Sequence, residues 1–244
     1  MDYGSLRNRF HPNNKLLSDW SLLFPIRGVL STIRESLLLF GLGDAIYYCS
    51  SDGEAAVWRA VYGQVLAQLR PYEDDTVHLH IVGHSLGATV AYDFIYGLFA
   101  PLSNWGDLRP DFADDPDYGN EYLRWREKKE NGSLHLGSLT SMASTLPILL
   151  LRSQTVVNRF FSGQILDPQV VGVYPGQGIR WKSFYDIDDI LAFPVRELFG
   201  SNEGIVDVQV DTGDLPDATH SGYWQESRVI REVADLLISA MPES

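Results

Sequence analysis

The chain of 244 residues contains a single cysteine, Cys49. One cysteine excludes a disulfide framework and a thiolate metal cluster, and we expect Cys49 to be a buried residue at the end of a short strand. Long apolar runs are also missing, because the longest, residues 37–40 and 148–151, fall far short of the roughly 18 residues that a membrane span needs. Residues 1–10 lack the apolar core of a signal peptide. We therefore expect a cytoplasmic protein without stable membrane insertion.

Positive charge is scarce as well. The sequence has 19 Lys and Arg against 32 Asp and Glu, a net charge of −13. Such a surface repels nucleic acid and anionic membranes, so neither is an expected partner. Hydrophobic residues make up 45% of the chain, which excludes disorder, collagen and coiled coil and favours a sizeable core. One domain over residues 1–244 is the simplest interpretation of this length.

The spacing of apolar residues predicts the secondary structure. Steps of three and four residues predict helices at 53–70, 86–99 and 226–241. Strands are predicted at 76–82, 134–142 and 178–185, and a further short β-prone run occupies 44–49. Strands that alternate with helices predict an α/β fold, a three-layer αβα sandwich around a mostly parallel sheet.

Residues 101–131 differ from the rest in composition. Between Trp105 and Gly119 stand five aspartates and one arginine, interleaved with glycine, proline and aromatic residues. This insertion is either a solvated surface loop or a cap over an active site. The cap interpretation rests on its aromatic residues, which are Trp105, Phe112, Tyr118, Tyr122 and Trp125.

The sequence Gly83-His84-Ser85-Leu86-Gly87 lies between a predicted strand and a predicted helix and fits the pattern G-x-S-x-G. A serine hydroxyl becomes a useful nucleophile when a strained turn presents it, and glycines two positions away keep that turn free of clashes. The following helix directs its N-terminus at the site, so the amide of Leu86 can stabilise an oxyanion. We predict Ser85 as a nucleophile; the alternative is an ordinary glycine-rich turn.

A serine nucleophile needs a base, and the sequence has six histidines. Five are expected to be structural because of their positions: His11, His78, His80, His84 and His135. His220 instead lies in residues 217–224, a polar loop directly before the last helix, where it can reach the serine. We predict His220 as the base; the alternative is a solvent-exposed loop histidine.

The third group should be a carboxylate after the strand that precedes the histidine. Asp186, Asp188 and Asp189 all follow the strand predicted at 178–185. We favour Asp189, then Asp186, then Asp188. The order Ser85, Asp189, His220 is the Ser…Asp…His chain order of α/β hydrolases.

Three motifs together resemble bacterial α/β-hydrolases of the serine esterase/lipase family: G-H-S-L-G at 83–87, D-D-I-L-A-F-P at 188–194 and H-S-G-Y-W at 220–224. The resemblance covers about residues 44–241. It implies hydrolysis of small-molecule carboxylic esters with short to medium acyl chains through an acyl-serine. Ser85 is then the nucleophile, His220 the general base and then acid, and Asp189 its orienting partner. No cofactor and no metal are implied.

Two other functions stay open. The same triad serves acyltransferases and thioesterases, which differ in the nucleophile that reaches the acyl-enzyme. A catalytically weak binding protein with a hydrolase-like fold is the other alternative, because the resemblance fails before the elbow. Members of the family have several strands there and a His-Gly loop that supplies a second oxyanion amide, and residues 1–75 contain neither pattern.

The fold is therefore expected to be N-terminally reduced. We expect the second oxyanion donor from residues before Asp44, with 24–28 as the candidate, or from a neighbouring chain. A shortened sheet also leaves an edge strand uncovered, which favours a homodimer or a covering helix at 15–40.

Overall fold

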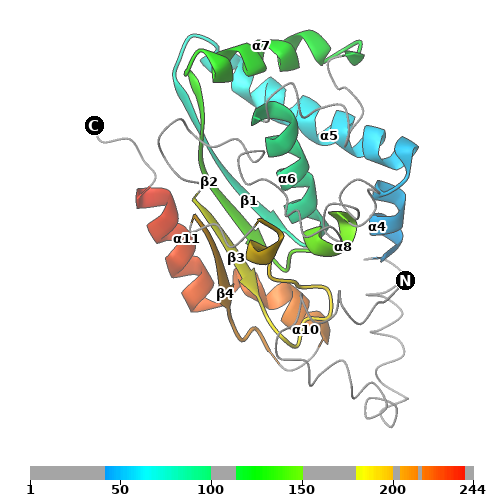
Figure 1. Ribbon diagram of the computed structural model, residues 1–244, viewed down its shortest axis with the longest axis vertical. Helices are drawn as coiled ribbons and strands as arrows, with labels where there is room; N and C mark the ends of the chain where they lie inside the picture. The colour runs from blue at the N-terminus through cyan, green and yellow to red at the C-terminus, as the bar shows by residue number, and fades with distance from the viewer. Residues whose placement is uncertain (1–41, 100–113, 151–179, 200–203, 214–215, 240–244) are drawn as a thin grey trace.

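The computed structural model describes residues 42–99, 114–150, 180–199, 204–213 and 216–239. In this part of the chain, four strands form one parallel sheet in the order β1-β2-β3-β4 (Figure 1). The strands are β1 (Val77–His84), β2 (Leu134–Met142), β3 (Trp181–Tyr185) and β4 (Ile205–Gln209). Because all strands are parallel, their carboxyl ends meet at one edge of the sheet. That edge carries Ser85.

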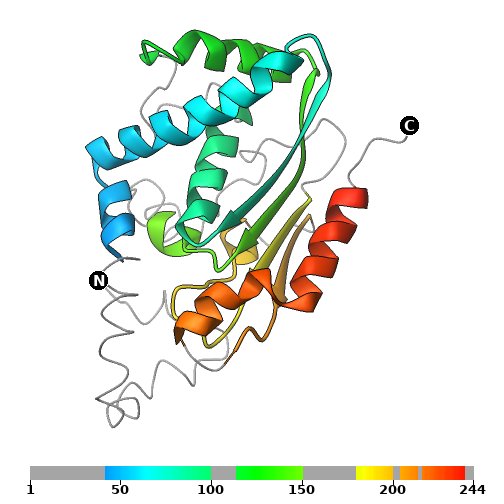
Figure 2. The ribbon, with the colours of Figure 1, turned by 180° about the vertical axis from the view of Figure 1, so that it is seen from behind.

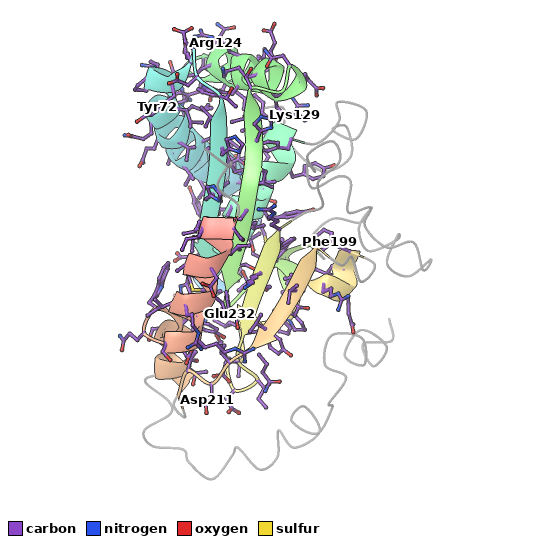
Figure 3. The ribbon with its side chains drawn as sticks, turned by 90° about the vertical axis from the view of Figure 1, so that its left-hand side faces the viewer. Tyr72, Arg124, Lys129, Phe199, Asp211 and Glu232 are labelled. Carbon is purple, nitrogen blue, oxygen red and sulfur yellow. The ribbon has the colours of Figure 1, made fainter. Side chains whose placement is uncertain are left out.

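Helices lie on both faces of the sheet, as expected for an α/β fold. The helix α6 (Leu86–Phe99) covers one face, and α5 (Ser51–Leu69) packs beside it (Figure 2). The helix α11 (Ser227–Ser239) lies on the opposite face (Figure 3). It is amphipathic, with Val229 and Leu236 buried. The predicted combination of a parallel sheet and helices on its two faces is confirmed.

Two apolar clusters fill the space between these layers. Under α5 and α6 the core is aromatic: Trp58 stacks on Tyr62 at 5.3 Å between ring centroids, and Phe94 meets Tyr62 edge-on at 4.9 Å. The cluster under α11 is smaller and includes Phe184 and Tyr223. Tyr223 also lies close to the predicted site, so this second cluster packs against the residues of that site.

The helices predicted at 53–70, 86–99 and 226–241 are found as α5, α6 and α11. The strands predicted at 76–82, 134–142 and 178–185 are found as β1, β2 and β3. The fourth strand, β4, was not located in the sequence. Its five residues do not show a clear alternation of apolar and polar side chains, because Asp207 stands between two valines. The Asp207 carboxylate accepts hydrogen bonds from the amides of Val195 and Arg196 at 2.9 and 3.0 Å.

The prediction of a β-prone run at 44–49 is wrong, because residues 44–48 belong to the helix α4 (Leu42–Tyr48). Ala45 and Tyr48, three positions apart, face the core, whereas Ile46 and Tyr47 are 70% and 54% exposed. This spacing suits a helix and not a strand. Cys49 follows the helix and is exposed, so the expectation of a buried residue ending a strand is wrong as well.

The described part of the insertion at 101–131 does not lie over Ser85. Its helix α7 (Gly119–Glu130) packs at the end of the molecule that holds the amino ends of β1 and β2, where Figure 3 labels Tyr72 and Arg124. Lys128 of α7 donates to the carbonyl oxygens of Glu73 and Asp75, just before β1. Tyr122 and Trp125 are buried in the main core instead of lining a site. Trp105 and Phe112 lie outside the described residues.

Five short helices complete the described structure. They are η2 (Arg70–Tyr72), α8 (Leu146–Leu150), η6 (Arg196–Phe199), α10 (Pro216–Ser221) and η7 (Gly222–Trp224). None of the helices in the described ranges is both long and apolar enough to cross a membrane. The predicted covering helix at 15–40 and the candidate donor at 24–28 fall outside these ranges.

Candidate active site

The turn between β1 and α6 presents Ser85 in a strained conformation. Its φ of 55° lies in the left-handed region, which a residue with a side chain rarely occupies. The Ser85 amide donates to the carbonyl oxygen of Met142 at 2.9 Å, and the Ala88 amide donates to the carbonyl oxygen of Ser85 at 3.0 Å. The turn is thus fixed from two sides. Ala143, next to Met142, is the other described non-glycine residue with positive φ, at 49°.

The two glycines of the turn have different surroundings. A Cβ on Gly83 would lie 2.6 Å from the Cα of Ala88 and 2.7 Å from the carbonyl oxygen of Gly87, so no larger residue fits there. A Cβ on Gly87 would meet nothing within 4 Å. Only the first glycine is therefore required by close packing of the backbone.

His220 hydrogen-bonds to both of its predicted partners. Its Nε2 lies 2.8 Å from Ser85 Oγ, and its Nδ1 lies 2.9 Å from Asp189 Oδ2. An ionised carboxylate only accepts hydrogen bonds, so Nδ1 carries the proton. Nε2 is then free to accept the hydroxyl proton of Ser85. His220 lies in the last turn of α10, not in the loop that was predicted.

The Asp189 side chain is fully buried, and both of its carboxylate oxygens accept hydrogen bonds. Its Oδ1 accepts from the amide of Leu191 at 3.0 Å. Its Oδ2, which faces His220, also accepts from the hydroxyl of Tyr223 at 3.2 Å. Burial raises the pKa of Tyr223, so this phenol keeps its proton and remains a donor. The carboxylate is held by three donors, one from its own loop and two from residues 220–223.

The other two candidate acids are engaged elsewhere. Asp186 is buried, but its Oδ2 accepts from the amide and hydroxyl of Thr212 at 2.6 and 2.9 Å, and its Oδ1 accepts from the amide of Asp188 at 2.9 Å. Asp188 itself is exposed. Of the three carboxylates, the structure brings Asp189 to His220.

Leu86 is the first residue of α6 and directly follows Ser85. An amide in the first turn of a helix has no acceptor four residues earlier within that helix, and the helix dipole adds positive potential at this position. The amide of Leu86 therefore stands where the helix favours a nearby negative charge.

Two residues at the site were not predicted as site residues from the sequence: Tyr223, and His84, which was expected to be structural. Tyr223 donates to Asp189, and its oxygen accepts from the amide of Asp186 at 2.8 Å. Nε2 of His84 lies 2.7 Å from the carbonyl oxygen of His220. Both belong to the motifs quoted above, at 220–224 and 83–87, and position within a motif was the only available signal.

The remaining histidines lie elsewhere. His80 Nδ1 is 2.9 Å from Ser138 Oγ, and the rings of His78 and His135 lie 4.8 Å apart on neighbouring strands. His11 is outside the described residues. In the part of the chain that the structure describes, no three histidine, cysteine or carboxylate side chains gather closely enough to hold a metal.

Comparisons of the chain with protein-family models, with curated proteins and with solved structures found no match. The functional argument therefore depends on the geometry of the site itself.

Proposed function

We propose that this protein is a serine hydrolase of α/β-hydrolase-like fold that cleaves carboxylic esters through an acyl-serine intermediate. One observation carries the proposal: His220 contacts Ser85 Oγ at 2.8 Å and Asp189 Oδ2 at 2.9 Å. These three side chains come from positions far apart in the sequence. Their convergence on a serine with φ of 55° is the arrangement that nucleophilic catalysis requires.

In the first half of the reaction, Ser85 Oγ attacks the ester carbonyl carbon while its proton passes to Nε2 of His220. The carbonyl oxygen becomes an oxyanion, which the amide of Leu86 stabilises. The imidazolium is stabilised by Asp189 through the hydrogen bond at Nδ1. When the tetrahedral intermediate collapses, His220 returns the proton to the departing alcohol, and the acyl group stays on Ser85.

In the second half, water replaces the alcohol. His220 takes a proton from the water, whose oxygen attacks the acyl carbon. A second tetrahedral intermediate collapses, Ser85 regains the proton, and the carboxylic acid leaves. The groups that the chain supplies are the side chains of Ser85, His220 and Asp189 and the main-chain amide of Leu86.

The test is reaction with a fluorophosphonate, which forms a stable phosphonyl adduct with an activated serine. We expect one equivalent of adduct on the peptide that contains Ser85, and release of p-nitrophenol from p-nitrophenyl acetate or butyrate. Ser85→Ala should remove both, whereas Ser133→Ala, at the amino end of β2, should change neither. Ester hydrolysis that survives in Ser85→Ala would contradict the proposal.

Product analysis separates hydrolysis from acyl transfer. The purified protein is given a p-nitrophenyl ester together with a competing alcohol or thiol. Hydrolysis predicts that free acid remains the main product, because water attacks the acyl-enzyme. Transfer of most acyl groups to the added alcohol or thiol would instead identify the same Ser85 chemistry as that of a transferase.

A further inference from the structure

His84 stands directly before Ser85 and is not used in the mechanism above. Its Nε2 lies 2.7 Å from the main-chain carbonyl oxygen of His220, a residue 136 positions away. A carbonyl oxygen only accepts hydrogen bonds, so Nε2 of His84 carries a hydrogen and donates it. The residue beside the nucleophile thus holds the main chain of the base.

We infer that His84 is a positioning residue, which fastens the main chain of His220 to the turn that carries Ser85 so that nucleophile and base keep one geometry. The inference rests on the proposed function, since it concerns the same reaction. His84 touches neither a substrate nor the reacting atoms in this scheme, and it acts through His220.

The need for such a contact follows from how His220 is held. Its Nδ1 is held by Asp189, and its Nε2 contacts the hydroxyl of Ser85 that is to react, so neither hydrogen bond of the ring holds the main chain of His220. The helix that carries it, α10, has six residues, so the main chain gains little rigidity from its own secondary structure. The bond from His84 adds a second fixed point, on the carbonyl group. Together the two points define the direction of Nε2 toward Ser85.

The ring of His84 is also packed into the segment that carries the base. Its centroid lies 5.0 Å from the ring of His220, 6.0 Å from Tyr223 and 5.9 Å from Trp224. These three residues lie at the end of α10 and in η7. His84 therefore joins the turn after β1 to the whole segment, and not to one carbonyl group alone.

The charge of His84 suits this place. Burial has the largest effect and lowers the pKa of His84; the hydrogen bond to the His220 carbonyl and the charge of Asp189 raise it, and the charge of His220 lowers it, so that the pKa lies below the ordinary value. His84 is therefore neutral at neutral pH, and it does not oppose the positive charge that His220 acquires when it takes the proton of Ser85. A permanently charged donor such as lysine would hold the carbonyl oxygen but would repel the imidazolium.

The experiment measures labelling of the full chain by a fluorescent fluorophosphonate at several concentrations, which separates kinact from KI. The variants are His84→Leu, which removes the donor, and His84→Gln, whose amide nitrogen can stand where Nε2 stood. His80→Leu is the matched control, because His80 lies on the same strand and contacts Ser138 instead of His220. Circular dichroism and the Tm of each variant establish that it is folded.

We expect His84→Leu to lower kinact by about tenfold to a hundredfold, since small displacements of reacting groups have effects of this size. KI should stay within about twofold of the original value, because the main contacts of the probe remain. His84→Gln should recover most of kinact, and His80→Leu should react like the unaltered protein. A purely structural role would not give this split between kinact and KI or the rescue by glutamine.

Other results would overturn the inference. Unchanged kinact in a folded His84→Leu would do so, and so would equal losses in the leucine and glutamine variants. If His84→Leu does not fold, nitrogen-15 NMR of the unaltered protein can identify the tautomer of His84. A proton on Nε2 supports the hydrogen bond to the carbonyl oxygen of His220. A proton on Nδ1 alone excludes that hydrogen bond. Absence of labelling at Ser85 in the unaltered protein would instead overturn the proposed function, and this inference with it.

Discussion

At the amino ends of β1 and β2, polar side chains fasten one element to the next, whereas at the carboxyl ends they converge on Ser85. At the amino end, Lys128 donates to the carbonyl oxygens of Glu73 and Asp75 at 2.8 and 3.0 Å, and Arg70 pairs with Glu121 at 2.9 Å. These contacts join α7 to the segment between α5 and β1. Their donors are permanently charged, so no proton needs to move.

The carboxyl end uses a different kind of partner. There the buried carboxylate of Asp189 pairs with the imidazole of His220, a group whose ring nitrogens can donate and accept a proton. The two positive φ values of non-glycine residues in the described part of the chain, at Ser85 and Ala143, are both found at this end. Strain and a hydrogen-bonded carboxylate–imidazole pair thus occur together where the chemistry is proposed. The contacts at the amino ends of the strands stabilise the sheet. At the carboxyl ends, strained backbone lowers stability but holds Ser85 in its position.

Among substitutions that test this difference between the two ends of the sheet, Asp189→Asn should have the largest effect on ester turnover. An asparagine keeps the shape but no longer selects the tautomer of His220 with the proton on Nδ1. We expect ester turnover to fall by up to about ten-thousandfold, the loss known for this change in a serine protease triad. Turnover of p-nitrophenyl butyrate by the folded variant is the measurement.

Asp186→Asn is the matched control for that change. Asp186 is also buried, but it serves Thr212 and Asp188, so its replacement should lower the Tm more than it lowers turnover per folded molecule. If Asp186→Asn abolished turnover while Asp189→Asn stayed active, the acid would have to be reassigned.

The turn around Ser85 offers the next comparison. Gly83→Ala forces a Cβ to within 2.6 Å of the Cα of Ala88, and because backbone atoms cannot move aside cheaply, we expect a cost of about 1–3 kcal/mol or more. Gly87→Ala meets open space and removes a glycine from a helix, so stability should be unchanged or rise by up to about 1 kcal/mol. Urea denaturation measures both. Equal destabilisation by the two alanines would contradict the described shape of the turn.

These contrasts also show what the sequence could and could not predict. The turn is a local pattern, since strand, glycines, serine and helix follow one another within residues 77–99, and this part was located correctly. Selection of Asp189 among three carboxylates depends on distant residues, because Thr212 takes Asp186 and Tyr223 supports Asp189. Spacing along the chain contains no information on such contacts.

The error at 44–49 has the same origin. The run is β-prone by composition, yet Tyr48 is buried, and Nε1 of Trp58 donates to its hydroxyl at 3.0 Å. Tertiary packing decided this case against the local pattern. Distant contacts also hold two of the aromatic residues of 101–131, since Tyr122 donates to the carbonyl oxygen of Gly97 at 2.6 Å and Trp125 is fully buried.

Two buried tyrosines at opposite ends of the molecule give a smaller and sharper test. The hydroxyl of Tyr122 donates to Gly97, and that of Tyr223 donates to Asp189. Tyr122→Phe removes the hydrogen bond to Gly97 and should lower stability by about 1 kcal/mol. Tyr223→Phe removes two hydrogen bonds, because the Tyr223 oxygen also accepts from the amide of Asp186, and it should lower stability by more. Tyr223→Phe should in addition lower turnover by roughly tenfold, because Asp189 loses a donor. Tyr122→Phe should leave turnover per folded molecule unchanged, and a comparable fall in both variants would contradict the separation of the two ends.

The smallest expected effect is a dependence of stability on pH, to which three histidines contribute. Burial lowers the pKa of His80, His84 and His135 below the ordinary value of 6.5. The unfolded chain therefore binds protons at these positions at a higher pH than the folded chain does. Stability rises with pH where the unfolded state binds more protons. The contribution of these histidines is complete above the ordinary histidine pKa, and it is lost as the pH falls below it.

We accordingly expect the Tm to fall between about pH 7 and 5, by less in variants that lack one of these histidines. The informative quantity is the difference between each variant and the unaltered protein, because carboxylates that titrate over the same range cancel in it. His80→Gln, on the part of β1 away from Ser85, should flatten the dependence of Tm on pH and leave fluorophosphonate labelling unchanged. His84→Gln should also flatten the dependence of Tm on pH. Its rate of fluorophosphonate labelling should depend on how well glutamine keeps His220 in place. A steeper pH dependence in either variant would mean that the replaced histidine is stabilised in its charged form, contrary to the lowered pKa that its partial burial gives it.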